Sequence, residues 1–329
     1  MKARTMLLVI AALSALGLSS STTARSAEEG SSTVAMDPAS GIPGAKIAFS
    51  RLKDTPTSNE FLKTEIWVMN GDGSEPRRLT HNTTWDLSPV WSPNGKTVAF
   101  YAVQFDALGQ VPIAPPHIYL VDADGSDQRL LTETRARFPS WSSNGEIAFD
   151  NGGGGSSDIF TLNADGSGLE QLTNDPTARN IRPDWSPNGH KIAFTSRRDG
   201  NDEIYVMNAD GTDPTRLTNN PASDSAPAWS PNGKKILFQS DRDDNVEIYV
   251  MDADGSNQTR LTDYPGRDQD ADWSPNGHEI AFERDIEPIE QQTLQVFVMN
   301  ADGSEQAPLT ALPSENGHPG WGRGPAVVP

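Results

Sequence analysis

WSPNGKKILF, at residues 229–238, contains the five-letter word that decides the fold of this chain. WSPNG recurs verbatim at 91–95, 185–189 and 273–277, with a near copy, WSSNG, at 141–145. A sixth Trp, Trp321, falls where the next copy is due, but GRGPAVVP follows it instead of a full repeat. The Trp residues of this repeat are 44 to 50 positions apart, at 91, 141, 185, 229, 273 and 321. A period of roughly 20–50 residues is typical of solenoids and propellers, so the repeat governs the architecture.

Three further markers accompany the Trp in a constant order. An IAF-like triplet is followed by an IYVMN-like run, then Asp-Gly, then Leu-Thr; the triplets occupy 47–49, 98–100, 147–149, 192–194, 236–238 and 280–282. Each unit thus supplies four short β-type runs, typified by PxWS, KIAF, EIYVMN and TRLT, bounded by Asn-Gly, Asp-Gly and Pro. Four antiparallel strands per ~44 residues, repeated radially, predict an all-β fold: a six-bladed β-propeller of four-stranded blades.

The two ends of the repeat array complement each other. The first unit opens at Lys46 with its second strand and lacks a preceding PxWS, whereas HPGWG at 318–322 is a first strand with nothing after it. We expect the C-terminal strand to join the N-terminal blade and close the ring. Closure would remove the exposed sheet edges that promote aggregation.

The recurrent words are interpreted as turns. In WSPNG, Trp fills the space between blades, Pro ends strand pairing, and Asn-Gly supplies the positive φ angles of a hairpin. The NADGS or DADGS word plays the same part between the third and fourth strands. It lacks the donor spacing and terminal Glu of an EF-hand, so a turn is favoured over a calcium loop.

The N-terminus has the composition of a secretory signal. Two cations precede an apolar run over 6–18, and Thr22 and Ala24 suit the −3 and −1 positions of a cleavage site. The run falls short of the ~20 residues that a membrane helix needs. We therefore expect a signal peptide at 1–24, a flexible leader at 25–45, the propeller at 46–322 and a tail at 323–329, with the mature chain in the periplasm or outside the cell.

Charge and composition exclude several classes of partner and chemistry. The formal net charge is −19, or about −21 once Lys2 and Arg4 are removed with the signal, which opposes nucleic acid and anionic lipid as partners. The chain has no Cys, so disulfides, thiolate metal sites and a Cys nucleophile are excluded. We expect a monomer with no transmembrane segment in the mature chain.

Length variation is confined to one face of the predicted propeller. The WSPNG and ADGS turns emerge on one face and hardly vary, whereas the connections at 52–64, 104–116, 152–155 and 284–293 emerge on the other. Function is commonly carried by variable loops on a regular frame, so this variable face is the predicted binding surface. The alternative is that each loop is only a tolerated insertion.

Acidic residues gather where the chain enters the first strand of each blade. Three residues before the recurrent Pro, or before Ala271 in its place, stand Asp86, Ala136, Asn180, Asp224, Asp268 and Asn316. One interpretation is a cation-binding ring at the channel mouth, with Ca²⁺ favoured by the oxygen donors. The other is that these side chains cap the blade-to-blade turn by bonding backbone N–H groups. Asp184, Asp270 and Asp272 lie beside them without recurring in every blade, which makes them the more site-like carboxylates.

No catalytic motif is present. GxSxG, HGGG, HExxH and a glycine-rich phosphate loop are all missing from the sequence, and the five His residues are dispersed over different connections. Paired carboxylates for acid–base chemistry stay open, but nothing singles out a pair. Four Arg residues lie on neighbouring connections: Arg135, Arg137, Arg179 and Arg182. They are interpreted as pairing with the carboxylates or recognising an acidic partner, but a set of surface salt bridges is favoured.

The repeat resembles that of the TolB family, periplasmic propeller proteins of the Tol–Pal system. The resemblance spans Lys46 to Trp321 and is strongest over 183–218 and 227–262. It implies six blades and a Pal-like lipoprotein received by the variable face and channel mouth, over Asp86, Arg182, Asp184, Asp224, Asp268, Asp272 and His318. The family has a mixed α/β domain where this sequence has only the short leader, so a TolB-like propeller is expected rather than a full TolB.

Two hypotheses of function follow. The leading one is a non-enzymatic exported propeller that binds a protein, peptide or cell-envelope ligand, with Asp270 joining the residues that the resemblance implies. The alternative is a metal-assisted carbohydrate-active enzyme, a lyase or hydrolase, at the channel mouth.

Overall fold

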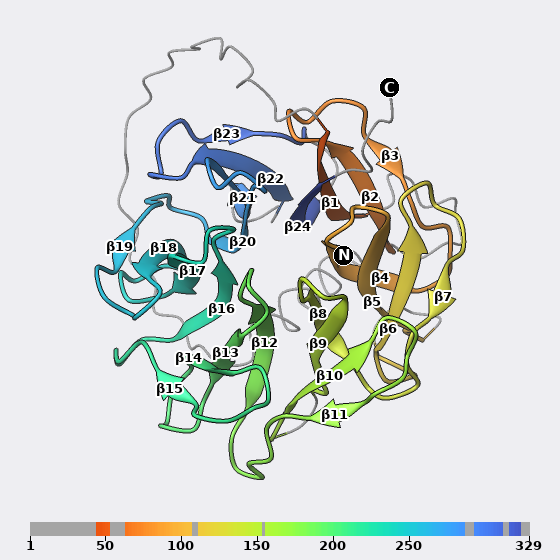
Figure 1. Cartoon of the computed structure of the whole chain (residues 1–329). Coiled ribbons are helices and arrows are strands. Elements are labelled where there is room, and N and C mark those ends of the chain that lie inside the picture. The colour runs from red at the N-terminus through yellow and green to blue at the C-terminus, as the bar shows by residue number, and fades with distance from the viewer. Residues whose placement is uncertain are drawn as a thin grey trace.

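Six sheets stand around a central axis in the computed structural model, which describes residues 44–52, 63–106, 111–152, 155–286, 293–311 and 316–323 (Figure 1). Each sheet has four antiparallel strands, so the predicted six-bladed all-β propeller is confirmed. The predicted signal peptide, the leader as far as residue 43, and residues 324–329 of the predicted tail lie outside the described residues. Within those residues, no helix is long and apolar enough to cross a membrane.

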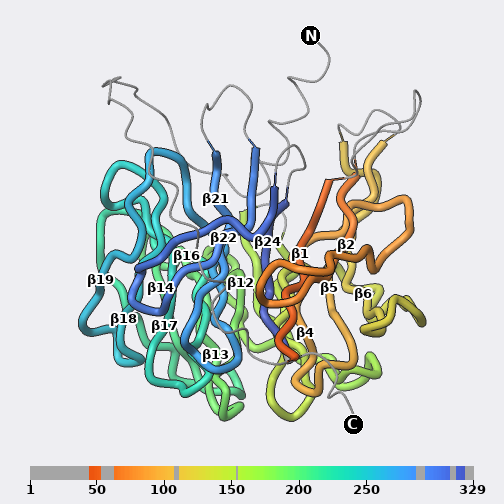
Figure 2. Tube along the Cα trace, turned by 90° about the horizontal axis from the view of Figure 1, so that it is seen from above, coloured from red at the N-terminus to blue at the C-terminus, as the bar shows by residue number. Residues whose placement is uncertain are grey.

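The strands follow one another outward from the axis in each blade (Figures 1 and 2). The inner strands are β4 (Trp85–Trp91), β8 (Arg137–Trp141), β12 (Asn180–Trp185), β16 (Asp224–Trp229), β20 (Asp268–Trp273) and β24 (Asn316–Arg323). The second strands are β1 (Ala45–Leu52), β5 (Thr97–Val103), β9 (Glu146–Asp150), β13 (Lys191–Ser196), β17 (Lys235–Ser240) and β21 (Glu279–Ile286). The third strands are β2 (Thr64–Asn70), β6 (His117–Asp122), β10 (Ile159–Asn163), β14 (Glu203–Asn208), β18 (Glu247–Asp252) and β22 (Thr293–Asn300). The outer strands are β3 (Arg77–Arg78), β7 (Arg129–Leu130), β11 (Glu170–Gln171), β15 (Thr215–Arg216), β19 (Thr259–Arg260) and β23 (Ala307–Pro308).

The ring closes through the last strand, as the sequence predicted. β24 pairs antiparallel with β1, which places Trp321 opposite Ile47 and completes the sheet in the order β24-β1-β2-β3. The N-terminal blade therefore contains both ends of the described chain. No inner strand is left without a neighbouring second strand in the six described sheets.

The outer strands are shorter than the TRLT word suggested. Only two residues of each word pair as a strand, as in Thr215–Arg216. The following Leu and Thr still contact the third strand: the Leu217 N–H donates to the Ile204 carbonyl at 2.8 Å, and the Thr218 hydroxyl accepts the Ile204 N–H at 2.9 Å. A short outer strand leaves little edge open to pairing with another chain.

The recurrent Trp packs between blades. Trp229 ends β16 and lies in one buried cluster with Ala193, Ile204 and Val206 of the preceding blade. Trp273 and Trp91 are placed in the same way against their own preceding blades. The repeated Phe of the second strand is almost fully buried in every blade. The predicted role of Trp as filler between blades is confirmed.

Both recurrent words are turns. In WSPNG at 229–233, the Asn232 side chain accepts hydrogen bonds from the Ser230 hydroxyl and the Lys234 N–H, and Gly233 has a φ of 69°. In DADGS at 252–256, the Asp254 carboxylate accepts both the N–H and the hydroxyl of Ser256. Gly255 has a φ of 89°, and an added Cβ would lie 2.7 Å from the Leu217 carbonyl of the preceding blade. The glycine is required both for the turn and for the contact between blades.

Candidate functional site

Every inner strand carries a β-bulge that turns one residue into a left-handed conformation. The pairing of inner and second strands shifts register at the same point in all six blades. The bulged residues have φ between 48° and 53°: Ser88, Phe138, Arg182, Ala226, Asp270 and His318. Non-glycine residues in this region cost about 1–3 kcal/mol each, so the surrounding contacts must hold them. No sequence signal announced these bulges, although five of the six residues precede Pro.

A side chain from the preceding blade holds four of the bulges. The Arg182 N–H donates to Asp150 Oδ2 at 3.1 Å, and the His318 N–H donates to Glu283 Oε2 at 2.9 Å. The N–H groups of Ala226 and Asp270 are accepted in the same way by Thr195 and Gln239. The accepting residue follows the IAF-like triplet in each case. It is a link between blades that the sequence analysis missed.

The bulges surround a cavity of about 150 Å³ at the centre of the ring. Three consecutive residues of each inner strand line it: 88–90, 138–140, 182–184, 226–228, 270–272 and 318–320. The lining therefore includes five of the residues predicted for the site, namely Arg182, Asp184, Asp270, Asp272 and His318. They come from β12, β20 and β24.

Arg182 and Asp270 form an ion pair across this cavity. The Arg182 Nη1 donates to Asp270 Oδ1, although β16 separates their strands in the ring. The guanidinium also lies over the Phe138 ring, 4.2 Å from its centroid. Burial alone would raise the pKa of Asp270, but Arg182 and then His318 outweigh it and hold that pKa below its usual range. The lowered pKa of Asp270 favours the ionised form of the pair, and both side chains are largely buried.

His318 lies between this pair and a second buried carboxylate, that of Glu283. Its Nε2 lies 3.4 Å from Asp270 Oδ2, and its Nδ1 lies 3.8 Å from Glu283 Oε2. Burial raises the pKa of Glu283, and His318 opposes that rise. Glu283 is 1% exposed and was not predicted as a site residue. Sequence offered no signal for it, since the position holds Thr195 or Gln239 in other blades.

Asp184 and Asp272 line the cavity, and both oxygens of each carboxylate accept hydrogen bonds. Asp184 accepts the Ser140 hydroxyl at 2.9 Å and the Trp229 N–H at 2.7 Å. Asp272 accepts the N–H groups of Trp273 at 2.8 Å and of Trp321 at 2.7 Å. Burial raises the pKa of Asp184 to about 6 and that of Asp272 to about 7. In this structure both carboxylates link neighbouring blades.

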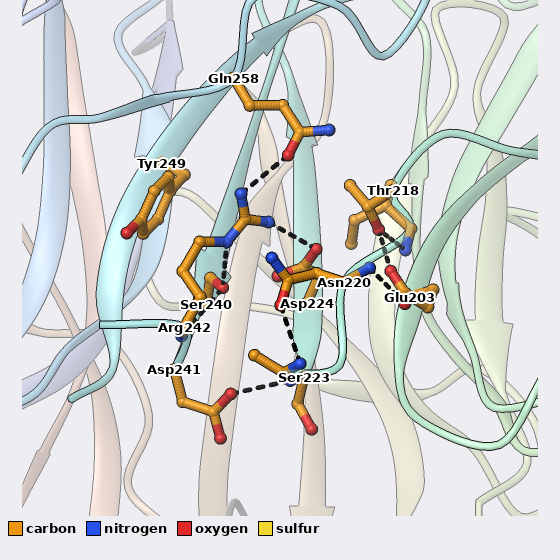
Figure 3. Close-up of polar contacts among 12 residues, drawn as sticks. Glu203, Thr218, Asn220, Ser223, Asp224, Ser240, Asp241, Arg242, Tyr249 and Gln258 are labelled. Atoms are coloured by element: carbon orange, nitrogen blue, oxygen red, sulfur yellow. Dashed lines mark hydrogen bonds and ion pairs between the residues drawn. The ribbon is translucent and has the colours of Figure 1, made fainter. Parts of the chain in front are cut away.

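The remaining predicted carboxylates lie inside the blades rather than on the cavity wall. Asp86, Asp224 and Asp268 are fully buried at the start of their inner strands. Figure 3 shows Asp224 against Arg242, whose Nη2 donates to Asp224 Oδ2 at 2.7 Å. Arg284 donates to both oxygens of Asp268, at 2.7 and 2.6 Å.

These carboxylates differ from the predicted turn caps in their partners. The expectation was a bond to backbone N–H groups of the turn, whereas Asp224 accepts from Arg242, just after β17, and Asp268 accepts from Arg284 within β21. Asp86 accepts the side chains of Asn82 and Thr84 at 2.7 and 2.8 Å. Burial raises the pKa of Asp86 to about 7. The three residues stabilise the blade entry.

A recurrent Glu accepts hydrogen bonds at the start of the connection that leads from the outer strand to the next inner strand. Glu203 begins β14 and accepts the Thr218 hydroxyl at 2.6 Å and the Asn220 N–H at 3.0 Å (Figure 3). It also accepts the Arg216 Nη2 at 2.5 Å. Glu247 repeats this network in the next blade. The first letter of the EIYVMN word could have revealed it as a structural residue.

The four predicted Arg residues are paired separately. Only Arg182 meets one of the site-like carboxylates; Arg137 contacts Asp150 at 3.2 Å, and Arg179 contacts Asp202. The Arg135 Nε donates to the Gly152 carbonyl. The four therefore do not form one basic patch.

The variable face is described only in part. Residues 53–62, 107–110, 153–154 and 287–292 of its predicted loops lie outside the described residues. In the loop between β5 and β6, the Asp106 N–H donates to the Val111 carbonyl and the Ile113 N–H donates to the Gln104 carbonyl, both at 2.8 Å. Val111 and Ile113 on this hairpin are 57% and 59% exposed. Large apolar side chains thus face solvent on the predicted binding face.

Comparison with known proteins gives a family and a fold. The TolB beta propeller domain family matches residues 109–322. An uncharacterized protein of Agrobacterium fabrum is 33% identical over 138 residues, which cover 40% of this chain and 43% of that protein. The match therefore spans less than half of this curated relative.

Solved structures with the same fold differ in what they do. TolB from Acinetobacter baumannii aligns with a TM-score of 0.68 and 23% identity, over 84% of this chain and 66% of that chain. Oligogalacturonate lyase in complex with manganese aligns with a TM-score of 0.52 and 12% identity, over 74% of this chain and 70% of that chain. At these identities the likeness concerns the fold.

Proposed function

This chain belongs to the TolB beta propeller domain family, and we propose that it is an exported, non-enzymatic protein whose ligand docks on the variable face and reaches the central cavity. A binding or scaffold role is the general one for TolB-like propellers. The ligand class proposed is a protein, a peptide or another component of the cell envelope. The resemblance to TolB makes a Pal-like lipoprotein the first candidate.

One observation carries the proposal. The scaffold repeats almost the same side chains in each blade, yet the six bulged residues at the cavity are all different: Ser88, Phe138, Arg182, Ala226, Asp270 and His318. A purely structural ring would repeat one small side chain at an equivalent position. Six dissimilar side chains make an asymmetric surface that can distinguish one ligand from another.

The proposed placement of the protein follows from its N-terminus and its family. The signal-like composition of residues 1–24 supports export, and the resemblance to the TolB family implies the periplasm. The mature chain is proposed to be monomeric in the periplasm or outside the cell, with no nucleic acid partner because of its net negative charge.

The cavity is also proposed to hold a cation. Ca²⁺ is the ion that the oxygen donors of the sequence favour. Among the described carboxylates that line the cavity, Asp270 offers the oxygen least used by the fold, because its Oδ2 accepts no hydrogen bond from the described residues.

Photo-crosslinking tests the binding face. A photoreactive amino acid at Thr177, exposed on the variable face, is compared with one at Lys234, exposed on a WSPNG turn of the opposite face. In a cell-envelope fraction, Thr177 should capture a discrete partner that Lys234 does not. Equal capture by both positions, or capture from Lys234 only, would place the partner elsewhere.

The second candidate is a metal-assisted lyase or hydrolase acting on acidic oligosaccharides. It is favoured by the juxtaposition of Asp270 and Glu283 with His318, and by the presence of an enzyme among propellers of this fold. Turnover of oligogalacturonate, measured with and without chelator, decides it. Chelator-sensitive turnover that His318→Gln abolishes would support the enzyme over the binding protein.

A further inference from the structure

Two polar atoms on the cavity wall have no hydrogen-bond partner among the described residues. Asp270 Oδ2 and Ser88 Oγ are both buried, and both belong to bulged residues that line the cavity. The Asp270 side chain is 8% exposed, and its other oxygen, Oδ1, accepts the Arg182 Nη1. His318 Nε2 lies 3.4 Å from Oδ2, which is longer than an ordinary N–H···O hydrogen bond. A buried acceptor without a partner is costly, so a donor inside the cavity would stabilise this wall.

The cavity wall carries more carboxylates than cations. Asp184, Asp270 and Asp272 line it. Among the described lining residues, Arg182 is the only Arg or Lys, and His318 adds a positive charge only when it is protonated. Burying carboxylates without compensation is costly, and the raised pKa of Asp184 and of Asp272 reflects that burial. A positively charged donor therefore suits this cavity better than a neutral one.

The neighbours of Asp270 select the kind of donor. A guanidinium binds a carboxylate best through both oxygens, but Arg182 already occupies Oδ1. A quaternary ammonium is recognised by aromatic faces, and the Arg182 guanidinium already lies over the Phe138 ring of the wall, 4.2 Å from its centroid. A primary ammonium is a compact charge with rotatable N–H donors, and a single oxygen is enough to bind it. It is the organic cation that best fits Asp270 Oδ2.

The rest of the wall suits a short aliphatic chain. Five prolines line the cavity: Pro89, Pro139, Pro183, Pro227 and Pro319. Their rings offer apolar contact to methylene groups that end in a charge, which is how a lysine side chain is commonly buried. A cavity of about 150 Å³ holds a molecule of roughly the size of benzene, and the butylammonium part of a lysine is of similar size. The cavity therefore accommodates one side chain and not a folded segment.

We propose that the docked partner inserts a lysine side chain into the cavity and that Asp270 Oδ2 accepts one of its N–H groups. Asp270 is the third residue of β20, which begins at the variable face and ends at the WSPNG turn of the opposite face. The lysine therefore enters from the variable face. This inference rests on the proposed function, because it names the chemistry by which the docked partner is recognised.

Titration with n-butylammonium chloride, the end of a lysine side chain as a free molecule, tests the cavity without the partner. The mature chain is followed by ¹H–¹⁵N NMR of its backbone amides, with a chelator present to remove divalent ions that would compete for Asp270. The amides of the bulged residues should shift to saturation, and those of the WSPNG turns should not. n-Butanol lacks the charge, tetramethylammonium lacks N–H groups, and methylguanidinium is suited to two oxygens. Each should bind about tenfold more weakly than n-butylammonium, or weaker still.

Asp270→Asn and a matched variant test the assigned acceptor. Asp270→Asn keeps the shape of the side chain but removes its charge, and should weaken n-butylammonium binding by about tenfold or more. Asp254→Asn, on an exposed ADGS turn, should leave it unchanged. The comparison of the four compounds uses the wild type, so it gives a result even if Asp270→Asn fails to fold. The inference is overturned if n-butylammonium shifts no bulge amide, if any of the other three compounds binds as tightly, or if folded Asp270→Asn binds it equally well.

Competition separates this inference from the proposed function. Saturating n-butylammonium should weaken binding of the partner captured from position 177, whereas the same concentration of tetramethylammonium, which matches the ionic strength, should not. If the partner binds equally well in both, the lysine assignment is overturned, the cavity takes a free amine instead, and the proposed docking function still stands. If no partner is captured at all, the proposed function fails and the lysine assignment fails with it, whatever n-butylammonium does.

Discussion

Arg182 on β12 reaches across the propeller axis to Asp270 on β20, two blades away, and lies on the Phe138 ring as it does so. The contact ties together residues that are 88 positions apart in the chain. It joins non-adjacent blades at the bulges, where the residue differs from one blade to the next.

Removing one partner of this pair should destabilise the propeller strongly. Asp270→Ala leaves Arg182 buried without its carboxylate, and loss of one partner of a buried pair costs about 3–5 kcal/mol. Urea unfolding measures the change in free energy. Lys235→Ala is the control, because Lys235 forms an exposed pair with Asp252 and should cost at most about 1 kcal/mol. Equal effects of the two substitutions would show that the pair across the cavity contributes no more to stability than an exposed ion pair does.

Stability should fall as pH rises through the titration of Asp272. Its folded pKa, about 7, lies above the ordinary value of 3.8, so between those values the folded state binds more protons than the unfolded state. Because of this group, the free energy of unfolding declines as pH rises from 4 to 7, with a slope of at most about 1.4 kcal/mol per pH unit. The contribution is constant above that range.

Asp272→Asn isolates that contribution. Urea unfolding at pH 5, 6, 7 and 8 should give the variant a shallower decline with rising pH than the wild type. Asp254→Asn, on an exposed ADGS turn, is the control and should not make the decline shallower, because the pKa of Asp254 is lowered rather than raised. Parallel profiles for wild type and Asp272→Asn would contradict the raised pKa.

Asp224 should behave as a structural residue. Asp224→Ala leaves the Arg242 guanidinium without its buried partner, and about 3–5 kcal/mol of stability should be lost. Asp210→Ala, on an exposed turn, is the control and should cost much less stability. If Asp224→Ala were stable but bound the ligand more weakly, Asp224 would instead be a binding residue, as the resemblance implies.

The closing strand should be indispensable. Trp321 is buried in a cluster with Ile47 and Phe49, and truncating a core Trp to Ala costs about 3–5 kcal/mol. A chain that ends at residue 311 lacks β24 and leaves β1 as an open edge beside the axis. It should unfold or associate, as judged by size-exclusion chromatography and circular dichroism. A monomeric, folded truncation would contradict the requirement for closure.

The propeller was predictable because its determinants are local and repeated. WSPNG, IAF, IYVMN and ADGS each specify a strand or turn from adjacent residues, and Trp321 without its hairpin predicts the closure. The exceptions are small: the TRLT word yields only two paired residues, as in Thr215–Arg216.

The site was predicted only in part because its geometry depends on the ring. Asp270 and His318 meet because β24 closes beside β20, and Arg182 meets Asp270 across the axis. Asp184 looked like a ligand because it does not recur, but its oxygens accept the Trp229 N–H and the Ser140 hydroxyl of the flanking blades. Such partners on neighbouring strands leave no trace in the local sequence.

The central claim is that the dissimilar residues of the cavity recognise the ligand. The most direct test uses the partner that the photoreactive residue at position 177 captures. Calorimetry measures its affinity for the wild type and for a triple variant, Arg182→Met, Asp270→Asn and His318→Gln, whose fold has been verified. The account predicts an affinity at least about tenfold weaker, a loss of about 1.4 kcal/mol, for the variant. An unchanged affinity would contradict it.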